Sequence, residues 1–372
     1  MKRERNSFII FLIIYIVLFY SNIYPCTTFI FRVGDHLYFG RNLDWISGTG
    51  LIMTNHRNLE KVALVDSTKN PVKWVSKYGS ITFNQVGKDL PYGGINEAGL
   101  VVEHMSLDKT VYSTASDRGD IEPCQWIQFQ LDNYETVEEV IQSDKLLRII
   151  DSSSKFHFLI CDRFGHSAVI EFINGEMVYY TGEDLPFEAL ANSTYKESVE
   201  CINNNGDTRS DRSLYNFTTA AKMISKIDST SQTKPIDYAF SILNSVSQGP
   251  GTKWSIVYDI TDMKFYIKVF ETPIIMGEHK IFMKQPGECK IKAVDIKEFN
   301  FDCTQNPKVL DLEYDAKGLV NQYFVDYTTD INKEFILKAF TFFKGWGTNI
   351  TLNEKEMDYL AKYPESFRCA EN

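Results

Sequence analysis

The chain contains the stretch Cys26-Thr27-Thr28-Phe29-Ile30-Phe31-Arg32-Val33, a Gly34-Asp35 pair, and then His36-Leu37-Tyr38-Phe39-Gly40-Arg41-Asn42-Leu43-Asp44. Two runs rich in aromatic and β-branched residues flank the Gly-Asp pair, a pattern that predicts two strands joined by a tight turn. Such a hairpin returns Arg41 and Asp44 to the neighbourhood of Cys26. The chemistry of this segment therefore depends on what precedes Cys26 in the mature protein.

The N-terminal segment has the composition of an export signal. Three basic residues among the first five precede an uncharged apolar run of thirteen residues, Phe8–Tyr20. A transmembrane helix needs roughly 20 residues, whereas the apolar part of a secretory signal needs roughly 7 to 15. We therefore expect residues 1–21 to be a signal peptide, residues 22–25 to be a short pro-segment that is removed separately, and the protein to be exported. A short uncleaved anchor and a lipid-modified Cys26 are the alternatives.

The overall composition is that of a globular protein. Of the 372 residues, 44% are apolar and 24% are charged, so the chain is too apolar for a disordered protein. Its formal charge of −10 comes without a basic tract. This argues against a nucleic-acid partner, because phosphate binding needs clustered Lys and Arg. An enzyme or a binding domain remains, with no stable membrane span after processing.

Strand-like and helix-like patterns alternate after the hairpin, which predicts a mixed α+β domain. A capping box at Thr136–Glu139 predicts the start of one helix, and apolar stripes predict two more at 214–224 and 238–246. Further strands are expected at 99–102, 156–161, 168–172, 255–258 and 264–269.

The last part of the chain has a different pattern. We expect residues 315–372 to form a helical C-terminal extension, in which Asn332 caps a helix that ends at Gly345.

Seven cysteines are present, and their spacing does not indicate a metal site, since there is no CxxC pair and no His/Cys cluster. We accordingly expect no metal and no cofactor. In an exported protein six of the cysteines could form up to three disulfides, with 15 connectivities open, or could be small buried apolar residues. The odd one is Cys26, which stands at a predicted new N terminus.

An N-terminal cysteine combines a nucleophile and a base in one residue. A model α-amino group has a pKa near 7.7 to 8.0, whereas a model lysine has a pKa near 10.4, so the terminal amine is the better general base at neutral pH. It can take the thiol proton and later return it to a leaving amine. Arg41 would favour the thiolate, and Asp44 would orient the amine. An ordinary salt-bridged turn is the alternative interpretation of this pair.

Further segments follow in order: Gly94-Ile95-Asn96-Glu97-Ala98-Gly99-Leu100, Ala191-Asn192-Ser193, and Thr252-Lys253-Trp254-Ser255-Ile256-Val257-Tyr258-Asp259. Together with Cys-Thr-Thr-Phe at residue 26 and Phe39–Asp44, they resemble the choloylglycine hydrolase family. This family contains the bile salt hydrolases and penicillin V acylases, within the N-terminal nucleophile (Ntn) hydrolases. The resemblance covers roughly residues 26–311.

The resemblance implies a four-layer αββα sandwich, which we assign to residues 26–314. It also implies that Cys26 is nucleophile and base, that Arg41 and Asp44 support it, and that Asn192 donates to the oxyanion. The implied activity is hydrolysis of the linear amide C–N bond of a small N-acyl substrate through a thioester, after autoproteolysis. The acyl group stays open among conjugated bile salts, phenoxyacetyl penicillins, acyl homoserine lactones and other N-acyl amino acids. The oligomeric state is also open, a homo-oligomer included.

Two positions depart from the family pattern. Ser106 stands where bile salt hydrolases have Asn and penicillin V acylases have Tyr. Asn216 precedes Phe217 where the family has an active-site Arg, and Arg212 lies four residues earlier. Either Arg212 reaches the site from a loop or the charge is absent. These departures motivate an alternative function, a non-catalytic exported binding protein on a degenerate Ntn fold.

Overall fold

The structure, a computed structural model, describes residues 25–65, 69–114, 117–151, 154–227, 234–270, 274–276, 279–281, 290–345 and 352–371. The predicted signal peptide, and all of the predicted pro-segment except Pro25, lie outside the described residues. Within these ranges, no helix is both long enough and apolar enough to cross a bilayer.

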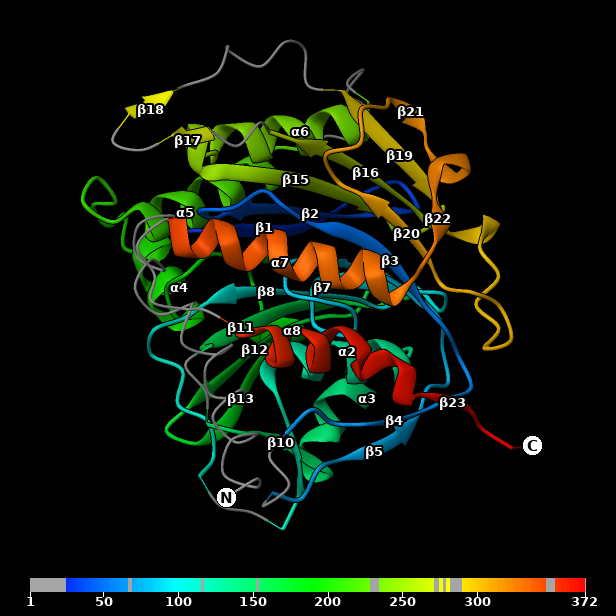
Figure 1. Ribbon diagram of the computed structural model, residues 1–372. Helices are drawn as coiled ribbons and strands as arrows, with labels where there is room; N and C mark the ends of the chain where they lie inside the picture. The colour runs from blue at the N-terminus through cyan, green and yellow to red at the C-terminus, as the bar shows by residue number, and fades with distance from the viewer. Residues whose placement is uncertain are drawn as a thin grey trace.

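Two large, mainly antiparallel sheets form the centre of the molecule (Figure 1). The first has seven strands, in the spatial order β14 (Ala189–Leu190), β1 (Thr27–Val33), β2 (His36–Asp44), β15 (Thr252–Asp259), β16 (Lys264–Val269), β19 (Ile291–Asp295) and β21 (Gly318–Leu319). The second has nine, in the order β13 (Glu176–Thr181), β12 (Ser167–Ile173), β11 (Phe156–Cys161), β8 (Val101–Ser106), β7 (Pro91–Asn96), β6 (Ser80–Asn84), β3 (Leu51–Asn55), β20 (Lys308–Asp311) and β22 (Val325–Asp326). The predicted hairpin is confirmed as β1–β2, with Thr28 opposite Arg41.

Helices cover both outer faces of this pair of sheets. The helices of the described residues are α2 (Pro123–Asn133), α3 (Val137–Gln142), α4 (Tyr195–Asn203), α5 (Arg212–Ile224), α6 (Pro235–Ser245), α7 (Thr329–Gly345) and α8 (Glu354–Lys362), of which α7 and α8 lie at one edge and not on an outer face. Helix α5 packs against β1, and α6 packs against β2 and β15, whereas α2 packs against β7 and β8 on the other side of the molecule (Figure 1). The predicted mixed α+β class is therefore confirmed, as is the capping box that begins α3.

Shorter elements complete the described structure. Small sheets pair β9 (Gly119–Ile121) with β10 (Leu147–Ile149), β4 (Leu59–Val62) with β5 (Lys73–Val75) and β23 (Arg368–Cys369), and β17 (Ile274–Met276) with β18 (His279–Ile281). Short 3-10 helices lie at Ser143–Lys145, Gly182–Asp184, Gly249–Gly251, Ile296–Glu298, Asn321–Tyr323 and Tyr363–Ser366.

Aromatic side chains fill the space between the two large sheets. The ring of Phe83 on β6 lies 6.4 Å from that of Trp254 and 5.2 Å from that of Phe265, both on the facing sheet. At Gly40 the packing is so close that an added Cβ would lie 2.3 Å from the ring of Phe29 on the paired strand. Any side chain at residue 40 would displace Phe29, which explains why glycine precedes Arg41.

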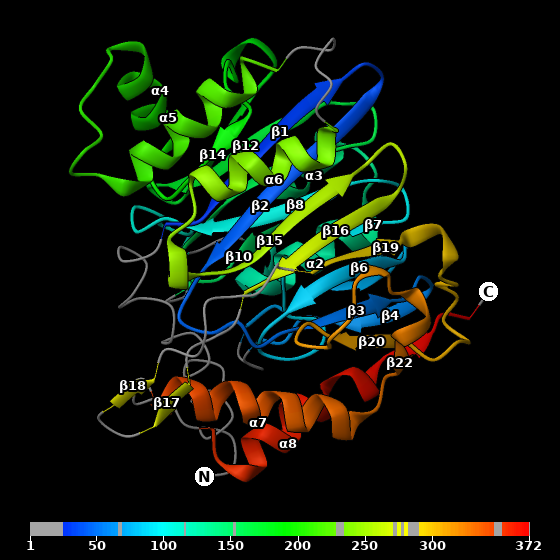
Figure 2. The same cartoon turned by 90° about the horizontal axis from the view of Figure 1, so that it is seen from above.

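The C-terminal segment is helical but also contributes strands to both large sheets. Helices α7 and α8 lie side by side at the edge of the molecule, near β20 and β22 (Figure 2). Strand β21 pairs with β19, and β22 pairs with β20. The expectation for Asn332 is wrong, because α7 begins at Thr329. The Asn332 side chain accepts from the Lys88 N–H and donates to the Ala361 carbonyl, and so it connects α7 to α8.

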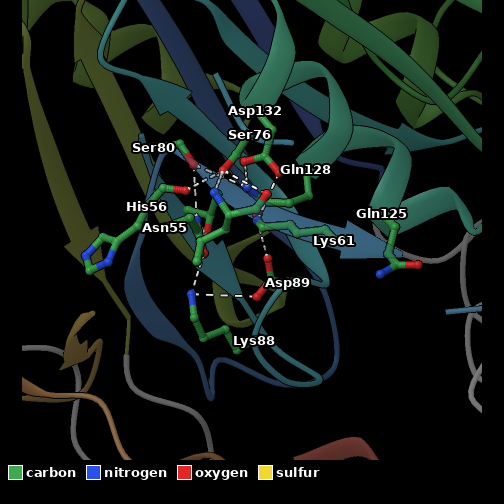
Figure 3. Close-up of polar contacts among 12 residues, drawn as sticks. Asn55, His56, Lys61, Ser76, Ser80, Lys88, Asp89, Gln125, Gln128 and Asp132 are labelled. Carbon is green, nitrogen blue, oxygen red and sulfur yellow. Dashed lines mark hydrogen bonds and ion pairs between the residues drawn. The ribbon is translucent and has the colours of Figure 1, made fainter. Parts of the chain in front are cut away.

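A buried charge network, whose polar contacts Figure 3 shows, is in contact with this segment. The Nζ of Lys61 is 2.7 Å from an oxygen of Asp89 and 2.9 Å from an oxygen of Asp132. The Nζ of Lys88 donates to the side-chain oxygen of Asn55 at 2.6 Å. Two cations and two carboxylates thus balance each other in the interior, where an unpaired charge would cost several kcal/mol.

The C-terminal residues cover that network. The Lys88 ammonium lies 5.7 Å from the ring centre of Tyr327, and the Lys61 ammonium lies 5.3 Å from that of Phe367. A disulfide between Cys303 and Cys369 connects the end of the chain to the main body.

This pair is one of the bridges that the sequence left open. Cys124 and Cys161 are free and buried, as expected for small apolar residues, and Cys201 is free and half-buried. Cys289 lies outside the described residues.

Candidate active site

Cys26 lies immediately before β1 and is only 8% exposed. Its thiol donates to the backbone carbonyl of Asp44 at the end of β2, with 3.7 Å between the sulfur and the oxygen. The pKa of this thiol is raised to about 12, first by burial and then by the Asp44 carboxylate, and the Arg41 guanidinium lowers it too little to compensate. Arg41 thus favours the thiolate, as expected, but the thiol of the uncleaved chain keeps its proton at neutral pH. A base must take the thiol proton.

Arg41 is held by a partner that sequence reasoning missed. Its fully buried guanidinium lies with Nε 2.8 Å from a carboxylate oxygen of Glu103, across the gap between the two sheets. The Tyr258 hydroxyl donates to the other oxygen of Glu103. An added Cβ at Gly93 would lie 2.0 Å from the Glu103 carboxylate, so glycine there leaves the space that the carboxylate occupies. Burial raises the pKa of Glu103 to about 7.

Asp44 keeps one carboxylate oxygen available. The Thr252 hydroxyl donates to Oδ1, whereas Oδ2 is buried and has no hydrogen-bond partner among the described residues. Burial raises the pKa of Asp44 to about 7, although the Thr252 hydrogen bond and the Arg41 charge both lower it. An α-amino group created by cleavage before Cys26 could donate to Oδ2.

Replacing Thr252 with valine is expected to move the acidic limb of the pH–rate profile upward. Ionised Asp44 is the form that can accept from an amine, so activity falls as the pH drops through about 7. The Thr252 hydroxyl lowers the pKa of Asp44. A hydrogen bond to a charged group is worth about 1.5–3 kcal/mol, so its loss should raise the pKa and shift the limb by about one pH unit. The measurement is kcat/KM between pH 5 and 9.

Thr252→Ser is the control, because it keeps the hydroxyl and should restore the wild-type profile. An acidic limb that does not move in Thr252→Val would contradict the assignment.

Asn216 contacts the residue that precedes Cys26. It is fully buried on α5, and its Nδ2 donates to the backbone carbonyl of Pro25 at 3.1 Å. Arg212 does not lie in a loop, because it is the first residue of α5. Its exposed guanidinium donates to the carbonyl of Ser247 at 3.0 Å and lies over the ring of Tyr215. From there its charge still lowers the pKa of Asp44.

Asn192 follows β14 and is anchored to the same helix. Its backbone N–H donates to the hydroxyl of Ser213 on α5 at 2.8 Å, and its Oδ1 is buried without a hydrogen-bond partner in the described part of the chain. Asn192 lines a cavity of about 560 Å³ together with Leu107. Ser106, half-buried at the end of β8, directly precedes that leucine. The structure thus brings Cys26, Arg41 and Asp44 together, and α5 connects Asn216 to Asn192.

Residues 26–204 match the linear amide C-N hydrolases, choloylglycine hydrolase family. This part of the chain belongs to the choloylglycine hydrolase family. A penicillin V acylase from Pectobacterium atrosepticum is 25% identical over 189 residues, which are 45% of this chain and 49% of that protein. The chain therefore aligns with only about half the length of this curated relative.

Solved structures of related proteins have the same fold. A penicillin V acylase from Agrobacterium tumefaciens superposes with a TM-score of 0.67 at 23% sequence identity. The superposition covers 82% of this chain and 98% of the acylase chain. A variant of the conjugated bile acid hydrolase from Clostridium perfringens superposes with a TM-score of 0.61 at 19% sequence identity, over 80% of this chain and 99% of the hydrolase chain. At these identities the likeness establishes the fold.

One group of side chains in this family member could contact a metal ion. Ligand atoms of His36, Asp259 and Asp262 lie within 4.8 Å of one another, at the turns that join β1 to β2 and β15 to β16. Asp259 already accepts from the Asp262 N–H at 3.0 Å. The group lies at the opposite end of β2 from Asp44 and cannot take part in chemistry at Cys26.

Proposed function

We propose that this protein is an exported amidase of the Ntn type, which hydrolyses the linear amide bond of a small N-acyl substrate through a thioester on Cys26. The observation that carries this proposal is the grouping of the Cys26 thiol, the buried Arg41 and the unpartnered oxygen of Asp44 at the start of β1. The order of helices, two sheets and helices supports the four-layer αββα class. Export is proposed from the leader at residues 1–21.

In the proposed mechanism the free α-amine of Cys26 is the base. It takes the Sγ proton, Sγ attacks the acyl carbonyl carbon, and the proton passes to the leaving amine as the C–N bond breaks. This leaves an acyl thioester on Cys26, which water hydrolyses to release the acid and restore the thiol. Asp44 orients the amine through Oδ2, and the Asn192 side-chain amide donates to the oxyanion. Cysteine is suited to this task because its thioester is a reactive intermediate that divides one difficult step into two.

The same groups support self-cleavage of the Pro25–Cys26 bond. If Sγ attacks the carbonyl carbon of Pro25, the negative charge develops on the oxygen that already accepts from Asn216 Nδ2 at 3.1 Å. The C–N bond then breaks as the thiol proton passes to the Cys26 nitrogen, which gives a thioester of Pro25 on the Cys26 sulfur and a free α-amine on Cys26. Water hydrolyses that thioester and leaves the active N terminus.

Asn216→Ala is expected to slow this cleavage about tenfold to a hundredfold, because a hydrogen bond to a developing charge is worth about 1.5–3 kcal/mol. The measurement is the time course of intact mass after purification of freshly made protein. Ser225→Ala at the end of α5, where the hydroxyl donates within its own helix, is the control and should be cleaved at the wild-type rate. Unchanged cleavage in Asn216→Ala would remove Asn216 from this step.

The proposed function is tested by a hydrolysis screen combined with mass spectrometry of the mature N terminus. The screen uses conjugated bile salts, phenoxyacetyl penicillin, acyl homoserine lactones and other N-acyl amino acids. We expect release of an amine from at least one class and a mature chain that starts at Cys26. A fully active preparation that starts at any earlier residue would overturn the mechanism.

A further inference from the structure

The cavity beside Asn192 has a strongly acidic lining. Its charged lining residues are Asp108, Glu197, Glu200 and Asp211, against Lys109 alone. Four carboxylates and one ammonium give this wall a formal charge of 1 − 4 = −3. Lys109 forms an ion pair with Glu197. The cavity therefore presents a negative potential to any ligand that enters it.

The acidic cavity adjoins the proposed reaction centre. Asn192 lines the cavity, and its backbone N–H donates to the Ser213 hydroxyl on α5. One turn later on the same helix, Asn216 donates to the carbonyl of Pro25, the residue next to the nucleophile. Thr28 lies opposite Leu190 in the antiparallel pair β1–β14, so Cys26 and Asn192 lie at the same end of this pair. A substrate whose carbonyl carbon lies at Cys26 can thus place one of its two ends in the cavity.

Two buried hydrogen-bond acceptors lie at Asn216, which contacts Pro25, and at Asn192, which lines the cavity. Oδ1 of Asn216 and Oδ1 of Asn192 are both buried and have no hydrogen-bond partner among the residues that the structure describes. The nearby Arg212 does not line the cavity, because its guanidinium donates to the Ser247 carbonyl. These acceptors and carboxylates complement a ligand that is rich in N–H donors and positively charged. A carboxylate or sulfonate would be repelled by the same wall.

We propose that the amine released by this enzyme carries a positively charged group in addition to the nitrogen freed from the amide. The substrates are then N-acylated diamines or similar N-acyl amines with an ammonium head. The head binds in the acidic cavity while the acyl carbonyl lies at Cys26. This inference rests on the proposed amidase function and specifies the amine half of its substrate.

A matched series of amides tests the proposal on the full processed protein. One acyl group, phenoxyacetyl or decanoyl, is attached to glycine, to ethanolamine or to one nitrogen of 1,2-diaminoethane. The three heads have nearly the same size. The glycine head carries one negative charge, the ethanolamine head is uncharged, and the 1,2-diaminoethane head carries one positive charge. We expect kcat/KM for the diaminoethane amide to exceed that for the ethanolamine amide about tenfold, with the glycine amide lowest, because several exposed charges each change binding two- to threefold. Raising the salt to 0.5 M should reduce the preference severalfold.

Two variants separate the cavity from general effects of charge. Glu200→Gln removes an exposed carboxylate from the cavity wall on α4 and should reduce the preference about twofold, through KM rather than kcat. Glu176→Gln, at the exposed start of the edge strand β13, is the control and should leave the preference unchanged.

The outcomes distinguish the two proposals. Hydrolysis of the series with equal rates, or with the glycine amide fastest, overturns the cationic amine and leaves the amidase function standing. No hydrolysis of any amide in the series or in the wider screen overturns the amidase function, and the inference about its product is lost with it.

Discussion

Replacing Cys26 with alanine is expected to remove N-acyl amide hydrolysis entirely, with a loss of at least about 10⁴-fold, and to leave the fold intact. Removal of a nucleophile in an enzyme of this kind has costs of that order. The fold should survive because the side chain loses one heavy atom and one long hydrogen bond to the Asp44 carbonyl. The measurements are turnover on any substrate found in the screen, circular dichroism, and intact mass. The variant should also retain the segment before residue 26.

The chain supplies a matched control for this variant. Cys161→Ala alters a cysteine that is likewise buried and free, on β11 in the other sheet. It should keep nearly full activity and normal processing. Turnover in Cys26→Ala above one thousandth of the wild-type rate would exclude the thioester mechanism. If neither protein turns over any amide, the result favours a binding protein on the same fold.

The hairpin and the position of Cys26 beside its end could be predicted because they depend on neighbours in the sequence. Apolar runs around Gly34-Asp35 specify β1 and β2, and their pairing places Asp44 beside Cys26. Glu103 could not be predicted as the partner of Arg41, because the two come together only when the sheets pack face to face. A signal was present, since Glu103 interrupts the buried apolar strand β8. A charge in such a strand needs a partner, but the sequence does not say which one.

The C-terminal segment shows the same limit. Its helical pattern is read correctly, but β21 and β22 are two-residue strands whose pairing depends on sheet edges formed by distant residues. Asn332 has the residue type of a helix cap, yet its amide is used inside α7 to connect α8 with Lys88. Residue type sets what a side chain can bond, whereas tertiary packing decides which bond forms.

The ionisation of the site also depends on packing. Asp44 and Glu103 are both raised to a pKa of about 7 by burial, and the Arg41 guanidinium lowers both. One cation therefore serves two carboxylates, each of which has a pKa near neutral pH. Because the positive charge of Arg41 is shared by Asp44 and Glu103, it does not by itself lower the pKa of the Cys26 thiol enough to ionise it. The proposed α-amine base supplies the step that the arginine does not.

Asn192→Ala is expected to lower kcat about 100- to 1000-fold with little change in KM, the usual effect of removing one oxyanion donor. The reason for the kcat effect is that a donor to the oxyanion stabilises a charge that exists only in the transition state. The variant should fold normally, because Asn192 is anchored by its backbone N–H on Ser213 and its Oδ1 has no hydrogen-bond partner among the described residues. Steady-state kinetics on the best substrate of the screen provide the measurement.

Ser193→Ala is the control for Asn192→Ala, because Ser193 lies in the same segment and bonds the same Ser213 hydroxyl at 2.8 Å. Loss of that bond can shift the segment but removes no donor to the acyl oxygen, so kcat should stay within about tenfold of wild type, since one neutral hydrogen bond is worth about 0.5–1.5 kcal/mol. Equal losses in the two variants would mean that Asn192 acts only by holding this segment in place. A large loss of kcat confined to Asn192→Ala assigns the transition-state contact to its side-chain amide.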